Sequence, residues 1–391
     1  MTEERQATRF LLLYALACAG SAVAYVPFLS ILLPVKVSAL AGPGVDATWM
    51  AYMAFAGAVM ASLCGIGFGY LSDRTGSRRG LTGLGLVLSS LMLLAVGRAN
   101  SLTGLLAVVI AWQICLNLML APLTAWAADT IPDHQRGLLG GMLAFAPAVG
   151  ALAGALITLS ARISPDGRLL LVVLIVIGCV VPVLIVGAPH APQPTEPMMP
   201  VDAPSDPIRA ARAMWIARFV VQVAQVALFS FLFFWLRSID STVSDSQTAR
   251  IFGAIQIASA PLALVVGRWA DRHRRPRLAL IACALLASLG LIGMALSKIL
   301  LIAIGAYGLF GFATSVFLAL HSAHTLTVLP RPDRRGRDLG LFNLTNTMPS
   351  LIMPWFTLAL VPHFGFSGLF LLLSLLTLSA SLVLVAIRRR F

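Results

Sequence analysis

Three polar residues share a regular spacing inside an otherwise apolar stretch: Arg218, Gln222 and Gln225, at positions i, i+4 and i+7. On an α-helix these side chains would lie on one face. A guanidinium in such a stretch is costly to keep, which makes it a candidate for function. Arg218 could attract an anionic group of a small solute. Two alternatives stay open: an ion pair with Asp129 or Asp338, or a side chain that reaches out to water.

Two histidines three residues apart, His321 and His324, stand in another apolar stretch. Histidine titrates near neutral pH, so either ring could carry a coupled proton. The alternative is a pair of neutral rings that bond to hydroxyls such as those of Ser322 or Thr325. No third ligand stands nearby in the sequence, so we expect no metal site.

Several amides also stand inside apolar stretches, for example Gln113 with Asn117 and Asn343 with Asn346. Amides in buried helices either bond to neighbouring helices or line a cavity. The candidate substrate-binding residues are Tyr25, Gln113, Asn117, Arg218, Gln222, Gln225, Gln256, Asn343 and Asn346.

The composition of the chain indicates the surroundings of these polar residues. Of 391 residues, 59% are hydrophobic and 11% are charged, and the mean hydropathy is +0.91. A single globular core cannot hide so much apolar surface, so lipid must be the solvent for most of it. A helix needs about 20 apolar residues to cross a bilayer. Twelve such stretches are predicted, at 10–34, 47–71, 80–97, 103–129, 138–161, 168–188, 210–237, 248–270, 278–297, 300–327, 339–361 and 365–387.

The net charge of +13 is explained by membrane topology. Most basic residues fall at the N-terminus, at the C-terminus and in the loops that follow even-numbered stretches. Basic loops stay in the cytoplasm, so both termini are expected there. This distribution accounts for the positive charge, so we expect no nucleic-acid partner. The excess of arginine over lysine is typical of a GC-rich bacterial genome, which favours the bacterial inner membrane.

A proline-rich segment divides the chain into two halves. Residues 188–209 carry seven prolines and no apolar periodicity, which favours extended, solvated chain. We therefore predict an N-terminal six-helix bundle at 1–188, a cytoplasmic linker at 189–209 and a C-terminal six-helix bundle at 210–391. Asp73 and Arg74 recur as Asp271 and Arg272, 198 positions later. An even number of spans per half makes this a parallel repeat, with an axis along the membrane normal.

One loop of this repeat carries a recognisable motif. The stretch GYLSDRTGSRRG, residues 69–80, matches G-x-L-x-D-R-x-G-x-R-R. With twelve spans in two sixes, this motif resembles the major facilitator superfamily across essentially the whole chain. Residues 336–354 resemble its sugar–proton symporter branch, which includes sucrose and glycoside carriers. The resemblance implies an all-α integral membrane protein that moves solutes by alternating access, with a site near the membrane midplane.

The resemblance also implies a role for the charged loop. In the family fold Asp73 faces the beginning of the eleventh span, and the arginines can pair with Asp129 at the end of the fourth. These contacts would latch the cytoplasmic side and release it when the cavity opens inward. The alternative is a solvated loop that only orients the protein. The candidate gating residues are Gly69, Asp73, Arg74, Gly76, Arg78, Arg79, Asp129, Asp271 and Arg272.

The positions of the acidic residues bear on how transport would be coupled to protons. All 15 lie in loops, tails or the ends of the apolar stretches, so no central carboxylate is available to carry a proton.

We expect a proton-coupled secondary transporter that takes up a small organic solute. The alternatives are an exporter, either of drugs or as an organic-anion/proton antiporter, a metallophore transporter, and a non-transporting membrane sensor or assembly partner. We expect a monomer in the bilayer, with no enzymatic activity and no cofactor.

Overall fold

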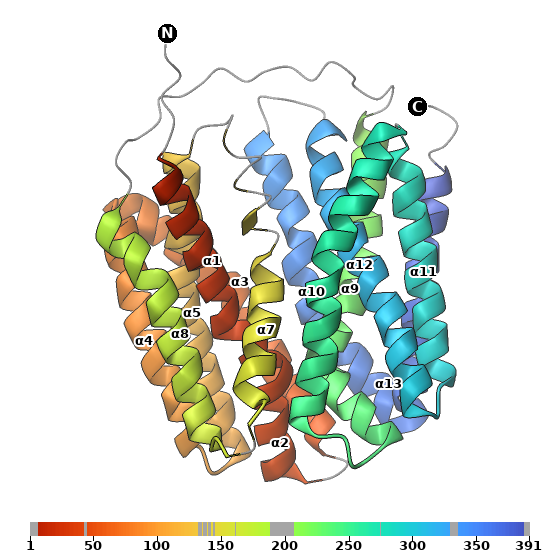
Figure 1. Ribbon diagram of the computed structural model, residues 1–391, viewed down its shortest axis with the longest axis horizontal. Coiled ribbons are helices and arrows are strands. Elements are labelled where there is room, and N and C mark those ends of the chain that lie inside the picture. The colour runs from red at the N-terminus through yellow and green to blue at the C-terminus, as the bar shows by residue number, and fades with distance from the viewer. Residues whose placement is uncertain are drawn as a thin grey trace. The chain divides into compact units, whose positions relative to one another are not determined.

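The computed structural model describes residues 7–42, 45–131, 145–160, 162–187, 207–273, 275–328 and 335–386, together with Gln135, Leu139, Met142 and Leu143. Nearly all of these residues are helical (Figure 1). The helices of the first half are α1 (Thr8–Pro27), the π-helical η1 (Phe28–Leu32), α2 (Leu33–Ala41), α3 (Asp46–Thr75), α4 (Arg78–Arg98), α5 (Leu102–Thr130), α7 (Ala146–Thr158) and α8 (Pro165–Val186).

The second half consists of long helices. They are α9 (Pro207–Ile239), α10 (Asp245–Arg272), α11 (Pro276–Leu296), α12 (Leu300–Val328) and α13 (Arg335–Ala386). The last of these joins two helices at Gly365, whose φ of 64° is a conformation that glycine adopts without steric cost. The break predicted between 361 and 365 is therefore a single non-helical residue.

Ten helical segments in the described part of the chain have the length and apolar composition to cross a membrane, and α7 is a shorter apolar helix. The expectation of an all-helical, multi-pass membrane protein is confirmed. Large apolar side chains also face outward, such as Leu301 and Ile66, which are 79% and 76% exposed. Lipid tails accept such a surface, whereas the backbone polar groups are satisfied within each helix. Part of the predicted span 138–161 lies outside the described residues.

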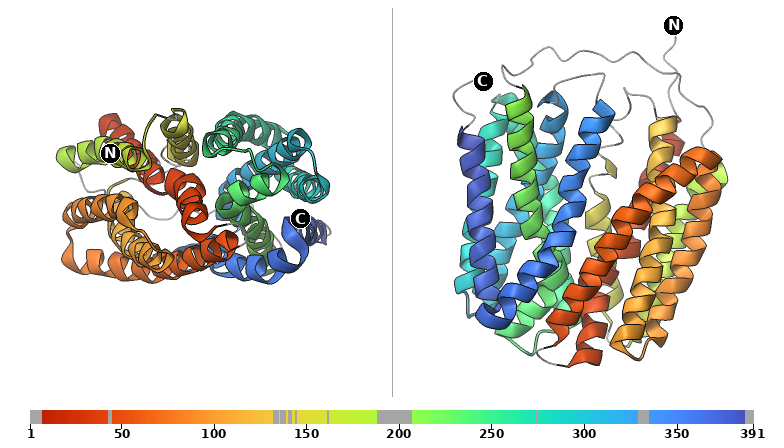
Figure 2. Two further views of the ribbon diagram at one scale, coloured as in Figure 1. Left: turned by 90° about the horizontal axis from the view of Figure 1, so that it is seen from below. Right: turned by 180° about the vertical axis from the view of Figure 1, so that it is seen from behind.

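The chain forms two compact units. Among the described residues, the first unit holds α1 to α8 and the first nine residues of α10, and the second holds α9, the rest of α10 and α11 to α13. Within the first unit α4 packs along α5 and α8, and within the second α11 packs along α12 and α13 (Figure 2). The predicted linker 189–209 lies almost wholly outside the described residues, so its boundaries stay a prediction.

The internal repeat is visible in the helix bounds. Helices α4 and α11 begin 198 residues apart, and so do α5 and α12. Each pair packs closely at a glycine. A Cβ added at Gly85 of α4 would overlap the backbone of Met119 in α5, and one at Gly290 of α11 would lie 2.7 Å from the backbone N of Phe310 in α12. Glycine thus permits the same close helix contact in both units.

Gly85→Ala and Gly290→Ala are expected to destabilise the protein by about 2 kcal/mol each, since the added methyl meets backbone that cannot yield cheaply. The measurement is thermal unfolding of the detergent-solubilised chain. Gly178→Ala is the matched control, because a Cβ there meets no described atom within 4 Å. Equal unfolding temperatures for all three variants would contradict the close packing.

Candidate functional site

The charged loop is a two-residue turn between helices. Helix α3 continues through Asp73 and Arg74 and ends at Thr75, and α4 begins at Arg78. Gly76 closes α3 in the left-handed conformation, with φ of 63°, and its N–H donates to the carbonyl of Ser72 at 3.0 Å. Such a C-terminal cap favours glycine, because other residues pay a steric cost there.

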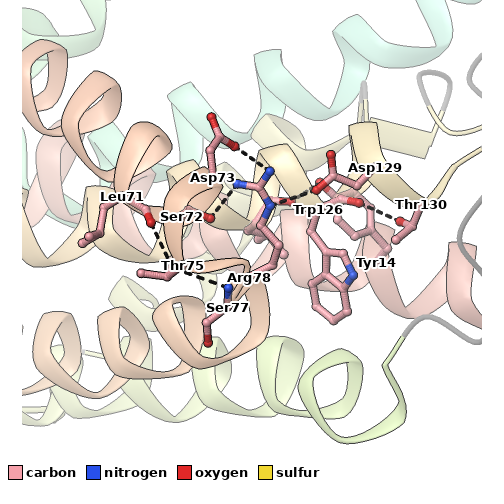
Figure 3. Close-up of polar contacts among 11 residues, drawn as sticks. Tyr14, Leu71, Ser72, Asp73, Thr75, Ser77, Arg78, Trp126, Asp129 and Thr130 are labelled. Atoms are coloured by element: carbon pink, nitrogen blue, oxygen red, sulfur yellow. Dashed lines mark hydrogen bonds and ion pairs between the residues drawn. The ribbon is translucent and has the colours of Figure 1, made fainter.

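Arg78 ties three helices together (Figure 3). Its guanidinium lies 2.6 Å from Asp73 Oδ1 and donates through Nε to Asp129 Oδ2 at 2.9 Å. It also donates to Ser72 Oγ at 2.7 Å. The Arg78 side chain is only 16% exposed, whereas those of Asp73 and Asp129 are 64% and 51% exposed. The sequence led us to expect the ion pair with Asp129, and it is present; the gating role stays a prediction.

The next arginine stabilises the end of another helix. Arg79 donates to the carbonyls of Leu184 and Ile185, which are unpaired groups at the C-terminus of α8. In the second unit Arg277 does the same for α13, since it donates to the carbonyls of Leu384 and Val385. Sequence reasoning missed Arg277, although its position 198 residues after Arg79 could have identified it.

The remaining members of the gating set are Arg74, Arg272, Gly69 and Asp271. Arg74 and Arg272 are exposed. A Cβ at Gly69 would meet no described atom within 4 Å, so no close packing among the described residues requires glycine there. Asp271 lies in α10, but its side chain is outside the described part of the structure.

Arg218 of α9 lies at the centre of a polar cluster in the second unit. It donates to Ser322 Oγ of α12 at 2.9 Å and to Asn346 Oδ1 of α13 at 3.1 Å. Its Nη1 is 3.5 Å from His321 Nδ1. Of its two expected ion-pair partners, Asp129 pairs with Arg78, and the side chain of Asp338 lies outside the described residues.

His321 is fully buried, and its Nε2 lies 2.8 Å from the carbonyl oxygen of Met214 in α9. The structure thus brings together three predicted residues: Arg218, His321 and Asn346. The side chains of His324 and Asn343 lie outside the described part of the chain, so their roles stay predictions.

Other predicted residues lie elsewhere. Asn117 donates to the backbone carbonyl of Gln113 at 2.8 Å, so this pair is a local contact within α5. Tyr25 is half-buried in α1, and Gln256 is half-buried in α10. Tyr25, Gln113 and Asn117 belong to the first unit and Gln256 to the second, and a role of each in substrate binding stays a prediction.

Three buried amide oxygens have no hydrogen-bond partner among the described residues: Oε1 of Gln113, of Gln222 and of Gln225. Buried polar atoms are rarely left unpaired, so each calls for a partner that the described residues do not supply. Gln222 and Gln225 follow Arg218 along the same face of α9, as the spacing predicted.

An ion pair at another place in the first unit was not predicted from the sequence. Arg168, in the first turn of α8, pairs with Asp245, the first residue of α10, and both residues belong to the first unit. Because α4 and α8 are antiparallel, with Arg79 beside Leu184 at one end and Gly97 beside Asp166 at the other, Arg168 lies at the opposite end of these helices from Asp73. Spacing gave no signal for this contact.

Comparisons with known proteins agree with this fold. The family profile described as Major Facilitator Superfamily matches residues 214–390. The structure is similar to that of a bacterial homologue of the human lysosomal transporter Spinster in an inward-facing and occupied conformation, with a TM-score of 0.70, 17% identity, and coverage of 98% of this chain and 96% of that one. It is also similar to the human organic anion transporter MFSD10 (TETRAN), with a TM-score of 0.65, 16% identity, and coverage of 96% and 99%.

The Spinster homologue in its inward-facing and unoccupied conformation gives a TM-score of 0.64 at 18% identity, over 97% of this chain and 94% of that one. No curated protein matches the sequence. At these identities the likeness shows the fold.

Proposed function

We propose that this protein is a secondary transporter of the major facilitator superfamily that moves a small organic solute by alternating access. The observation that carries the proposal is the similarity of fold over almost the full length of both chains to structures described as transporters. The family profile match over 214–390 supports the same assignment. A transporter of this kind needs no nucleophile, cofactor or metal.

The proposal includes the finer architecture. We infer twelve membrane helices in two bundles of six, related by a pseudo-two-fold axis along the membrane normal, with both termini in the cytoplasm of a bacterial cell. The repeat of helix bounds at 198 residues and the parallel roles of Arg79 and Arg277 support it. The protein would act as a monomer in the inner membrane.

Proton-coupled uptake is the mode that we propose. The buried His321 beside Arg218 supports it, since an imidazole can carry a proton and the sequence predicts no central carboxylate for that role. Arg218 also favours an anionic cargo, and one structural relative is named as an organic anion transporter. Export by antiport and metallophore transport stay as alternatives, and uptake by a carrier of the sugar–proton symporter type rests on residues 336–354 alone.

A non-transporting sensor or assembly partner is the alternative of another class.

The test of transport uses purified full-length protein in proteoliposomes that hold a pH-sensitive dye, challenged with sugars, organic acids, metallophores and lipophilic drugs. We expect one class of solute to move together with protons. Absence of flux above protein-free vesicles would contradict transport. Flux without proton movement would contradict proton coupling and indicate a facilitator or an exchanger.

A further inference from the structure

The second copy of the charged loop differs from the first in two residues that decide its chemistry. In the first copy Arg78 donates to the hydroxyl of the buried Ser72 and pairs with two carboxylates. At the same places of the repeat, 198 positions later, the second copy has Pro276 and the buried Ala270. Proline carries no charge and alanine no hydroxyl, so the contact by which Arg78 ties three helices together has no counterpart at these positions.

The second copy instead carries more positive charge. Residues 69–80 hold three arginines and one aspartate, whereas residues 267–278 hold five arginines and one aspartate. One aspartate cannot balance five arginines, so the end of α10 and the beginning of α11 form a basic segment. A basic segment next to a membrane span attracts anionic lipid headgroups.

Two of these arginines lie on one face of α10. Arg268 and Arg272 are four positions apart, which places them one turn apart on the same side of the helix, and both are exposed. Arg275, also exposed, follows in the turn to α11, where its backbone N–H donates to the carbonyl of Ala270 at 3.0 Å. Guanidinium groups bind phosphate oxygens through a planar fork of N–H donors, so neighbouring arginines can share one phosphate.

The same face of α10 is apolar one turn further into the helix. Leu264 and Val265 are exposed, and they precede Arg268 by four and three positions. Both belong to Asp245–Ala270, a segment with the length and apolar composition to cross a membrane. The rise from Val265 to Arg272 is about 10 Å. That is less than the thickness of one leaflet, roughly 20 Å, so one lipid molecule can contact both the apolar and the basic part.

An exposed tryptophan lies where the two parts of this face meet. Trp269 follows Arg268 directly, and its ring centroid is 5.0 Å from that of His273, one turn further along α10. Nδ1 of His273 is also 2.8 Å from the carbonyl oxygen of Trp269, which keeps the imidazole beside the indole. Tryptophan is typical of the boundary between lipid tails and headgroups. The face thus presents apolar, interfacial and basic groups in the order in which a phospholipid presents their partners.

We propose that the end of α10 is a binding site for an anionic phospholipid. Its phosphate accepts hydrogen bonds from Arg268 and Arg272, its glycerol lies beside Trp269, and an acyl chain lies along Leu264 and Val265. A soluble anion would use only the basic part of this face. A zwitterionic lipid would bring its own cation close to the guanidinium groups, so the net charge of the headgroup decides the preference. The site belongs to the second unit, and the inference does not depend on the proposed transport function.

The first arm of the test is native mass spectrometry of the purified full-length protein with added phosphatidylglycerol or phosphatidylcholine of the same acyl chains. We expect the first phosphatidylglycerol to bind about tenfold more tightly, because each arginine near a membrane surface favours an anionic lipid by about fivefold. Arg268→Gln combined with Arg272→Gln should remove this preference, and lysine at both positions should keep most of it. Arg250→Gln, an exposed arginine at the other end of α10, is the control.

The second arm identifies the source of the phosphate and the part played by the indole. Glycerol 3-phosphate and inorganic phosphate, each in large excess, should not displace the bound phosphatidylglycerol, since neither has an acyl chain. Trp269→Ala should weaken the binding of both lipids and leave the preference for the anionic one. Thermal unfolding of every variant in detergent checks that the fold is intact, and we expect no change because the substituted side chains are exposed.

Three outcomes would overturn the inference. The first is equal affinity for the two lipids, and the second is an unchanged preference in the variant with glutamine at both arginine positions. The third is displacement of phosphatidylglycerol by a soluble phosphate, which would make this a site for a soluble anion. Each of them leaves the proposed transport function standing, because none of these measurements depends on flux.

Discussion

Arg78→Ala is expected to abolish most transport activity and to lower the free energy of unfolding by about 2 kcal/mol. Arg78 is the shared partner of Asp73 and Asp129, and it also bonds to Ser72. Its loss leaves two carboxylates at the ends of α3 and α5 without the cation between them. The ends of three helices are then no longer tied together, so the proposed latch cannot form. The measurements are flux in proteoliposomes and thermal unfolding in detergent.

Lysine at this position should rescue little, because one ammonium cannot reproduce a planar fork that faces two carboxylates and a hydroxyl. Arg98→Ala is the matched control, since Arg98 is an exposed arginine at the other end of α4. Full activity and stability in Arg78→Ala would contradict both the proposed latch and the stabilising effect that we assign to the contacts of Arg78.

The second large effect is expected at the ion pair of Arg168 and Asp245. Their side chains are 12% and 22% exposed, so solvent screens them weakly. Asp245→Asn would leave the Arg168 charge buried without its partner, which costs about 3 kcal/mol. The expected result is a lower unfolding temperature in detergent and a reduced flux, which we attribute to loss of the contact between α8 and the beginning of α10.

The reversed pair Arg168→Asp with Asp245→Arg should recover part of this stability, because the attraction is restored with opposite polarity. Arg162→Gln changes an exposed arginine nearby and should have little effect. If Asp245→Asn unfolds at the same temperature as the unmodified protein, the pair does not stabilise the first unit as the structure indicates.

The sequence predicted those features that are local or repeated. Runs of apolar residues predicted most of the helices, because a membrane span requires a minimum length. The family resemblance of the charged loop implied that its arginines can pair with Asp129, and Arg78 does so. The shared face of Arg218, Gln222 and Gln225 followed from helical periodicity alone.

Contacts between distant segments were harder to predict. Arg168 and Asp245 are 77 positions apart, and nothing in their spacing links them. Likewise, the sequence identified Arg218 and His321 as costly residues, but it could not show that they face each other, since that depends on how α9 packs against α12. The break at Gly365 was expected near the correct residue, yet the sequence suggested a short loop where a single glycine suffices.

Solute counterflow tests the central claim, transport by alternating access, most directly. Proteoliposomes are loaded with a high concentration of the unlabelled solute that gives the largest flux, and a trace of the labelled solute is added outside. For a carrier whose site faces one side at a time, we expect the labelled solute to accumulate transiently above its equilibrium level. This accumulation should be absent with Arg78→Ala. Simple equilibration of the label, or its failure to enter, would contradict the account.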